Sequence, residues 1–326
     1  MRGPPCATAL VAVACLSPAA AVAQSGLEEV RDRVRDLVRG DGLGDQLLGL
    51  SGFAALPGVS AARFDTEPAD GPDTEINRLI LPLARQLQGR HLLGGAPYLE
   101  GTFGYTRMTQ SGALDRGAAQ KLRIRGSVTT FSALAGAGLG YELPPGLTLR
   151  PLALLGYAHL DNDTDFDGPG AEILGPVLDD IVANFTADEL LYGAALAVEA
   201  ERPAGALDLG LSLRYNHLWG TTLRASDDAL DGSSSFGVFT AAATVAGPLP
   251  ATAFGHELRW LAFASNSSFP GLSGDALGFD YFFELGGGLE IVDRGVMPGV
   301  EGLSLRASYL FGDHVTGVSV GAHLEF

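Results

Sequence analysis

Apolar and polar residues alternate along several segments of the chain, as expected of β-strands with one apolar face. Between residues 279 and 291 the odd positions are mostly apolar, whereas the even positions carry Asp280, Glu284 and Glu290. Residues 207–215 and 303–311 repeat this alternation, and so do the last twelve residues, which end on Phe326. Repeated one-sided strands of this kind are typical of a transmembrane β-barrel.

The alternating segments predict an all-β fold, a transmembrane antiparallel barrel of about twelve strands. We expect these strands at residues 58–66, 75–87, 96–108, 123–142, 147–160, 188–202, 206–219, 235–247, 252–265, 277–292, 301–312 and 315–326. Short connections at 144–146, 202–205 and 247–250 alternate with long ones at 110–121, 161–189, 221–234 and 266–275. In outer-membrane barrels the short turns are periplasmic and the long loops external. If the C-terminus is periplasmic, an even strand count predicts that the N-terminal segment is on the periplasmic side too.

Two stretches have helical rather than strand periodicity. Residues 27–39 carry apolar residues at helical spacing and alternate acidic with basic residues, so they predict a short amphipathic helix. Two positions are open for this helix, across the periplasmic mouth or threaded into the barrel. Residues 171–184 predict a second helix inside the longest external loop.

The N-terminus has the features of a secretory signal peptide. Arg2 precedes an apolar run at 7–16, and Ala21-Val22-Ala23 forms a small-residue cleavage site before Gln24. A lipoprotein signal ending at Cys15 is disfavoured because Ala12 stands where a branched apolar residue is expected. We therefore predict a signal peptide at 1–23, an N-terminal helix and linker at 24–54, and a barrel at 55–326. Both cysteines lie in the signal peptide, so the mature chain has no disulfide.

Composition narrows the class further. The sequence has no apolar run near the ~18 to 20 residues of a spanning helix, which excludes a helical membrane protein. Many of its 45 glycines fall inside alternating segments, where they suit barrel curvature. The net charge of −17 and the single lysine, Lys121, argue against nucleic-acid binding.

Three features carry a family resemblance: residues 97–105 (PYLEGTFGY), residues 81–83 (LPL) and the aromatic C-terminal strand. Together they resemble the solitary outer-membrane autotransporter-like β-barrels over about residues 55–326. The resemblance implies a twelve-stranded barrel in the outer membrane of a Gram-negative cell, in contact with its lipid. It also implies that the barrel-assembly machinery recognises the C-terminal strand through Phe326. The chain departs from full autotransporters because only about thirty residues separate the cleavage site from the first strand, so no passenger domain fits.

One segment resembles the start of a calcium loop. Asp163, Asp165 and Asp167 are spaced two apart and precede Gly168, but Leu174 stands where the bidentate acid of such a loop is required. The sequence therefore offers these three aspartates as a weak calcium site in an external loop, against the simpler interpretation of a solvated acidic loop. No other cofactor is expected.

Catalytic patterns are weak. His217 followed by Asp227 and Asp228 could activate water as in outer-membrane proteases, but the alternation gives His217 the lipid-facing side of its strand. We expect no enzyme and no catalytic residues.

A set of charged residues occupies the alternate strand positions that are expected to face the barrel interior. Paired charges are tolerated in a closed interior, whereas single ones are costly, so we expect either a braced lumen or a narrow polar pore. The expected lumen charges are Glu100, Arg150, Asp208, Arg214, Glu257, Arg259, Asp280, Glu284, Glu290 and Arg306, with His323 and Glu325 near the C-terminus.

Three functions follow from these patterns. The preferred one is an autotransporter-like outer-membrane barrel without a passenger, acting as a narrow polar pore. The alternatives are an outer-membrane hydrolase, a protease or lipase with its site on the external loops, and a structural or adhesive surface protein.

Overall fold

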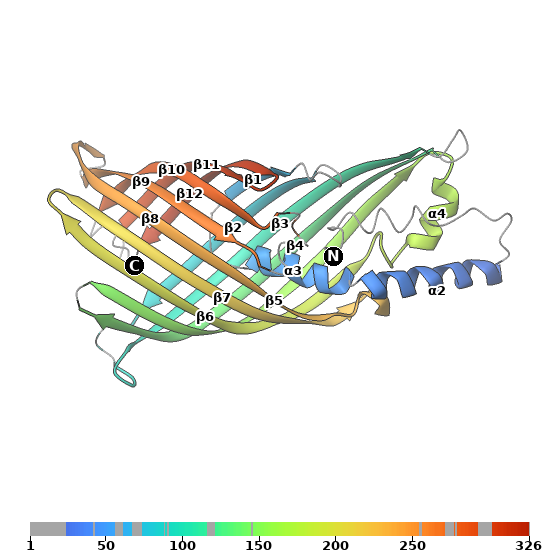
Figure 1. The fold of residues 1–326 in the computed structure, drawn as a ribbon, viewed down its shortest axis with the longest axis horizontal. Coiled ribbons are helices and arrows are strands. Elements are labelled where there is room, and N and C mark those ends of the chain that lie inside the picture. Colours follow the sequence, from blue (N-terminus) through green and yellow to red (C-terminus); the bar gives the residue numbers. More distant parts are fainter. Residues whose placement is uncertain are drawn as a thin grey trace.

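The computed structural model describes residues 24–325 apart from 42, 56–60, 67–73, 88, 90, 116–120, 145, 254–255, 271–276, 278 and 293–301. Twelve antiparallel strands form a closed barrel in which each strand pairs with its neighbours in sequence and β1 pairs with β12 (Figure 1). Closure gives every strand a hydrogen-bonded neighbour on both sides, as a membrane interior requires. The predicted fold class and strand count are confirmed.

The strands lie close to the predicted segments. Their bounds are β1 (Ala61–Thr66), β2 (Thr74–Gln86), β3 (Ala96–Asp115), β4 (Lys121–Leu143), β5 (Leu147–Asp167), β6 (Thr186–Ala204), β7 (Leu207–Ala225), β8 (Ser233–Ala253), β9 (His256–Ser268), β10 (Tyr281–Val292), β11 (Gly302–Gly312) and β12 (Val315–Glu325).

Several boundary predictions were wrong: β3 and β7 run past their predicted ends, β10 begins later than predicted, and two further cases have a clear physical reason. The predicted turn at 247–250 lies inside β8, which passes Pro248 with a register shift and continues to Ala253. Proline has no N–H to donate to the neighbouring strand, and β8 accommodates Pro248 where its pairing with β9 is irregular. Strand β5 also runs on to Asp167, so the polar residues 161–167 belong to the wall rather than to a loop. Polar composition suggested a loop there, but strand pairing with β4 decides the conformation.

The helical elements that the structure describes beside the barrel include α2 (Gln24–Asp41), α3 (Leu43–Ala55), α4 (Ala171–Leu178) and the short η2 (Asp228–Leu230). The predicted helix at 27–39 is confirmed as part of α2, and the predicted helix at 171–184 is confirmed over the eight residues of α4. Within the described residues, none of these helices is long and apolar enough to cross a membrane. Helix α3 was not predicted.

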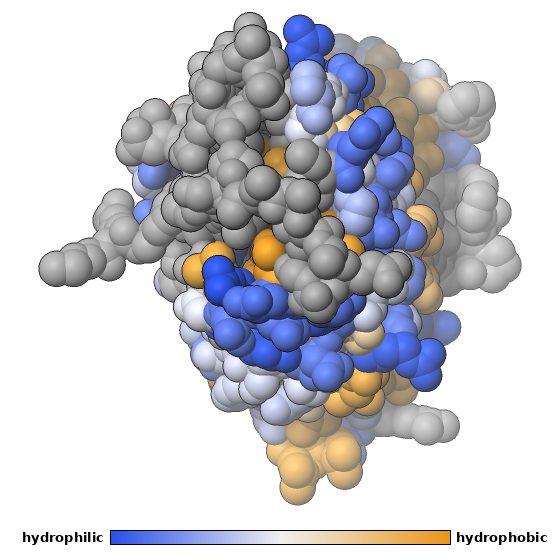
Figure 2. Space-filling model, turned by 90° about the vertical axis from the view of Figure 1, so that its right-hand side faces the viewer, coloured by the Kyte–Doolittle hydropathy of each residue, from blue (hydrophilic) through white to orange (hydrophobic). Residues whose placement is uncertain are grey.

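We call the end of the barrel with the longer connections the loop end and the opposite end the turn end. The loop end carries α4 between β5 and β6, and η2 between β7 and β8. The turn end carries tight connections, such as that between Ala204 and Leu207. Seen from the loop end, the described surface around α2 is mostly hydrophilic, and hydrophobic residues show mainly on the more distant flanks (Figure 2).

The alternation places apolar side chains on the outer wall. Leu285, Leu305 and Val320 are each at least 60 % exposed, although they are large and apolar. On the same strands Glu284, Ser304 and Ser319 face inward and are at most 8 % exposed. This inversion of the usual burial of polar and apolar residues fits a wall whose outer solvent is lipid.

The seam between the first and last strands is short. Strand β1 pairs with β12 over six residues, from Ala61 opposite Val320 to Thr66 opposite Val315. The adjoining pair of β11 and β12 extends over eleven residues. Among the described residues, β1 therefore supports only the half of β12 nearer the loop end.

Candidate functional site: a plugged lumen

Helix α3 lies inside the barrel, in the half of the lumen nearer the loop end (Figure 1). It contacts the six strands from β3 to β8. Its side chains Leu47, Leu48, Leu50 and Phe53 are at most 5 % exposed, and they pack on inward-facing apolar residues of the wall. The lumen is therefore mostly apolar where it surrounds α3, with a few buried polar side chains, and the helix fills it as a plug.

Two glycines let the plug approach the wall. A Cβ atom at Gly52 of α3 would overlap the ring of Phe236 on β8. A Cβ atom at Gly104 of β3 would overlap the carbonyl oxygen of Ala54, near the end of α3. Close approach of a helix to a wall requires such positions without side chains. The sequence alone gives glycine in many strands and does not distinguish these two.

The last turn of α3 is held by an aromatic cluster and one arginine. The Phe53 ring lies 5.9 Å from that of Phe64 and 5.7 Å from that of Phe269. The Arg78 guanidinium of β2 lies 4.4 Å from the centre of the Phe53 ring, in cation–π geometry. Arg78 is 7 % exposed and was missed by the sequence analysis, although it shares the inward face of its strand with Ile76.

Below the plug, toward the turn end, the lumen is polar. Arg214 of β7 donates two hydrogen bonds to Glu100 of β3, at 2.5 and 2.9 Å, and so joins strands on opposite sides of the lumen. Glu100 lies on the same face of β3 as Gly104, two inward positions nearer the turn end. Arg150 pairs with Glu199 at 2.5 Å and covers the Tyr98 ring at 4.8 Å. The sequence predicted Glu100, Arg150 and Arg214 as lumen charges but not their partners Glu199 and Tyr98.

Most other predicted lumen charges also occupy inward positions. Asp208 pairs with Arg259. Glu284 accepts a hydrogen bond from Ser308 Oγ at 2.5 Å, and Arg306 donates one to Ser304 Oγ at 3.1 Å. Glu290 is 8 % exposed on β10, and Glu257 is exposed near the turn end of β9.

Asp280 departs from this set. It is exposed at the loop end and precedes β10, which begins at Tyr281. Inward and outward positions alternate only within a strand. The alternation therefore does not predict the direction of the Asp280 side chain, which lies before β10 begins. The neighbouring Phe279, assigned by parity to the lipid face, is instead buried in the aromatic cluster. His323 and Glu325 lie opposite Ser304 and Gly302 of β11, but their side chains lie outside the described part of the structure.

Helix α2 lies at the loop end, against α4 and η2 (Figure 1). Arg31 donates hydrogen bonds to the carbonyl oxygens of Pro176 and Asp179 at 2.6 and 3.0 Å, where α4 ends. Arg35 donates to Asp227 at 2.8 Å. The periplasmic position predicted for the N-terminal segment is therefore wrong with respect to the barrel, because α2 is at the end opposite to the C-terminal residues of β12. The alternative, that the helix at 27–39 is threaded into the barrel, does not describe α2 either; the helix inside the lumen is the unpredicted α3.

The pair of Arg35 and Asp227 is electrostatically well supported. Burial alone would raise the pKa of Asp227, but hydrogen bonds from the Ala229 N–H and from Arg35 outweigh it. The pKa of this carboxyl is therefore below its ordinary value. The same hydrogen bond is the main cause of a raised pKa at Arg35. The Asp227 side chain is only 9 % exposed, so this contact is more than a surface ion pair.

The aspartates offered as a calcium site lie on a strand. Asp163, Asp165 and Asp167 are exposed on the outer face of β5, opposite Ser127, Arg125 and Arg123 of β4. Successive residues of one strand face are separated along the strand and do not converge as loop ligands do. Within the described chain, no group of three or more His, Cys, Asp or Glu side chains is arranged to hold a metal. The calcium site remains a prediction.

The residues considered for hydrolysis are apart from one another. His217 faces outward on β7, where it contacts Tyr215 and Trp219. Asp227 points to Arg35, on the helix that lies across the loop end. The geometry thus gives the carboxylate a different partner from the one the hydrolase alternative needs.

The sequence matches the solitary outer membrane autotransporter beta-barrel domain over residues 65–321. The chain belongs to this family. The match extends over most of the barrel, from the end of β1 into β12. The family resemblance seen in the sequence is confirmed, and the chain is an autotransporter-like outer-membrane β-barrel. No curated protein matches the chain.

Solved structures of similar shape include autotransporter barrels. The transport unit of AIDA-I from Escherichia coli is 13 % identical, with 82 % of this chain and 88 % of that chain covered and a TM-score of 0.49. The translocator domain of NalP from Neisseria meningitidis is 14 % identical, with 82 % and 86 % covered and a TM-score of 0.44. The beta domain of BrkA from Bordetella is 17 % identical, with 82 % and 98 % covered and a TM-score of 0.42.

Membership in the family identifies residues 65–321 as an outer-membrane β-barrel domain. Two sequence predictions concern residues beyond those described. The signal peptide with cleavage after Ala23, and the recognition of Phe326, both lie outside the described residues.

Proposed function

We propose that this barrel is an outer-membrane pore whose lumen is closed by its own N-terminal segment. The observation that carries the proposal is the division of the lumen into two halves. A polar, ion-paired half near the turn end is continuous with an apolar half that α3 fills. Removing α3 would leave a twelve-stranded barrel with an open interior, and charged side chains in the lower half would set its ion selectivity.

The contact between plug and wall is imperfect, which supports a plug that can leave. Among the described residues, the hydroxyl groups of Thr106, Thr130 and Ser132 are buried on the inward faces of β3 and β4 without a hydrogen-bond partner. Each such group costs about 1–3 kcal/mol relative to its hydrated state. Water that entered an unplugged lumen would satisfy all three.

Glu189 adds to this effect on the other side of the plug. It is 1 % exposed on β6, and its atom Oε2 has no hydrogen-bond partner among the described residues. The side chain of α3 that faces it is Ser51. A buried carboxyl oxygen without a hydrogen-bond partner weakens the seat of the helix, because a polar group is costly to bury unsatisfied.

The two termini have roles that extend the proposal. We infer that residues 1–23 direct export and are removed after Ala23, so that α2 begins at the mature N-terminus. Phe326 would present the C-terminal strand to the barrel-assembly machinery. With the turn end in the periplasm, α2 and α4 would be on the cell surface, as in barrels whose long loops are external.

Single-channel recording in planar bilayers tests the pore. The intact mature chain is expected to conduct little, whereas a variant lacking residues 24–55 is expected to open a channel severalfold larger. Arg214→Gln in the unplugged variant should shift its ion selectivity toward cations, because the lumen loses a positive charge. A matched Arg63→Gln change on the outer face should leave selectivity unchanged, since Arg63 pairs with Glu75 outside the lumen.

If the variant lacking 24–55 folds but conducts no better than the intact chain, the pore is wrong. Folding is checked by heat-modifiable mobility on a gel. A folded, non-conducting barrel would favour the structural or adhesive function through the loop end.

A further inference from the structure

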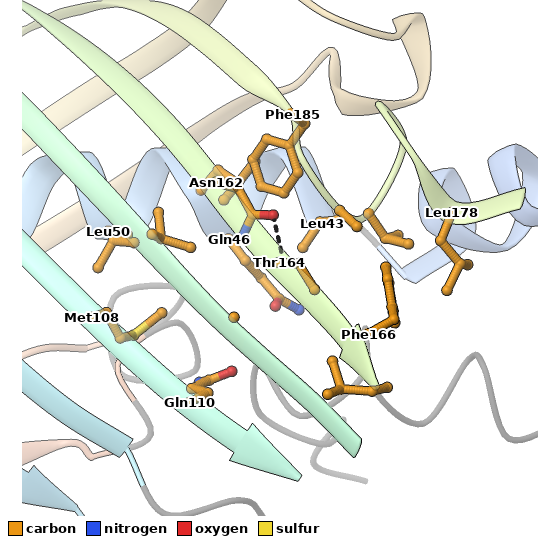
Figure 3. Close-up of a pocket in the computed structure, with 16 residues that line it drawn as sticks. Leu43, Gln46, Leu50, Met108, Gln110, Asn162, Thr164, Phe166, Leu178 and Phe185 are labelled. Carbon is orange, nitrogen blue, oxygen red and sulfur yellow. Dashed lines mark hydrogen bonds between the residues drawn. The ribbon is translucent and has the colours of Figure 1, made fainter. Parts of the chain in front are cut away.

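A cavity of about 100 Å³ lies between the plug and the barrel wall. Leu43, Leu47 and Leu50 of α3 form one side of it (Figure 3). The opposite side comes from inward residues of β3, β4 and β5, and the segment around α4 covers its loop end. These further lining residues include Met108, Ile124, Val128, Phe166, Leu178 and Phe185. The cavity is therefore assembled only when α3 is seated.

The lining has a distinct chemistry. Among the described residues, no charged side chain lines the cavity, and most of its surface is aliphatic, aromatic or thioether. Its polar groups come from Gln46, Gln110, Asn162 and Thr164. Asn162 accepts a hydrogen bond from Thr164 at 2.8 Å and one from the Asn184 N–H at 2.9 Å, which fixes its amide within the wall.

We propose that this cavity is a binding site for a small uncharged molecule with an apolar body and one hydrogen-bonding group, such as a substituted phenol. The absence of counter-charges in the described lining excludes an ion, because an unpaired charge is costly to bury. An apolar cavity of about 150 Å³ binds benzene. This one is smaller, at about 100 Å³, but it is partly open, so a single-ring ligand can extend through its open side. A few polar groups in a mostly apolar pocket fix the orientation of such ligands.

Occupancy of this site would also hold the plug in the lumen. A ligand that contacts α3 on one side and β3 to β5 on the other is bound only in the plugged barrel, so it stabilises that state by mass action. This coupling rests on the seated position of α3 and not on conductance. Binding without conductance would therefore support the site while contradicting the pore.

The test is calorimetric titration of the purified, folded barrel with 4-methylphenol. We expect a saturable 1:1 signal for the native chain, and none for the charged analogue 4-methylbenzoate. Val128→Phe, which fills the cavity from β4, should weaken binding by at least about tenfold, as a misfit of this size does in an apolar pocket. Ala135→Phe places the same ring on the exposed outer face of β4 and should leave binding unchanged.

A second measurement does not depend on the Val128 variant folding. Saturating 4-methylphenol should slow hydrogen exchange in residues 43–55 of the native barrel, and removing residues 24–55 should abolish saturable binding. Uptake that is non-saturable and equal in all variants would show partition into detergent and overturn the proposal. So would equal binding of 4-methylbenzoate.

Discussion

Gly104 is the residue of the wall that lies against the end of the plug, where Ala54 directs its carbonyl oxygen at the strand. Gly104→Leu is expected to prevent α3 from seating, because the new side chain needs the space that the helix end occupies. The channel should then open without any deletion, with conductance near that of the chain lacking 24–55.

Gly101→Leu is the matched control, since a Cβ atom there has nothing within 4 Å. Equal conductance in the two leucine variants would contradict the proposed role of Gly104.

Arg214 and Glu100 form the ion pair that crosses the lumen, and both side chains are largely buried, at 17 % and 8 % exposed. Arg214→Ala leaves the Glu100 carboxylate without its partner, so we expect the barrel to lose on the order of 3 kcal/mol of stability. Thermal unfolding, followed by the shift of the folded band on a gel, measures this loss.

The double variant Arg214→Ala, Glu100→Gln should recover much of that loss, because the stranded charge is gone. A double variant as unstable as the single one would show that the pair contributes through packing alone.

Side-chain direction at single residues could be read from the sequence, because strand alternation is regular. The charges Glu100, Arg150 and Arg214 were found in this way. Their partners could not be predicted, since Glu100 and Arg214 belong to strands that are not adjacent. Arg78 shares its face with isoleucines, and its binding partner Phe53 belongs to a helix that the sequence did not reveal.

Helix α2 is held at the loop end by the hydrogen bonds of Arg31 and by one ionic contact with η2, Arg35 with Asp227. Arg35→Ala should release α2 from η2 and raise hydrogen exchange across residues 24–41. Arg33→Ala is the matched control on the same helix, because Arg33 pairs only with Glu29 on an exposed surface among the described residues. Similar exchange in the two variants would contradict the anchoring role of Arg35.

The same contact predicts a pH dependence. The pKa of Asp227 is lowered in the folded barrel, so its stabilising contribution is complete above the unfolded value of about 3.9. It is lost as the pH falls through the lower folded value, where the carboxylate becomes protonated. We expect α2 to stay docked from neutral pH to about pH 4 and to loosen below it. In Asp227→Asn, rate-corrected hydrogen exchange of α2 should be high at every pH.

Sequence analysis found α2 and missed α3 for a physical reason. Residues 27–39 alternate apolar and charged residues at helical spacing, as a helix with one wet face does. Residues 43–55 are apolar or small on nearly every side, because the barrel wall surrounds them. A helix enclosed in this way has no polar face, so its helical periodicity cannot be recognised in the sequence. Its glycines also suggest a linker rather than a helix.

The whole barrel depends on lipid for its outer solvent. Leu305 is 60 % exposed on the outer face of β11, away from both ends of that strand. Leu305→Arg should reduce stability in a bilayer by about 2–4 kcal/mol if this position is near the membrane midplane. Folding titrations into lipid vesicles measure the change.

Thr316→Arg is the control for depth, since Thr316 is exposed on the same wall at the loop end of β12. The cost there should be about 0–1 kcal/mol. Equal costs at both positions would be inconsistent with a membrane-embedded wall.

Fold class and strand count could be predicted for the molecule as a whole, because many weak alternating segments reinforce one another. The position of the N-terminal segment could not. The prediction assumed that the chain enters the first strand at the turn end, but the described part of β1 begins at Ala61, opposite Val320 and partway up the wall. The helix before β1 occupies the lumen. The even number of strands therefore did not predict where the N-terminal segment lies.

The short seam between β1 and β12 bears on how the barrel assembles in time. It joins residues on the order of 250 positions apart in sequence, whereas every other pair of strands is consecutive. Closing so long a loop has the largest entropic cost, and the described part of the seam offsets it with six residue pairs. We expect strands β2 to β12 to form first as a curved open sheet, with β1 closing it last. On unfolding, the same seam would part first, giving an intermediate that is open along one side.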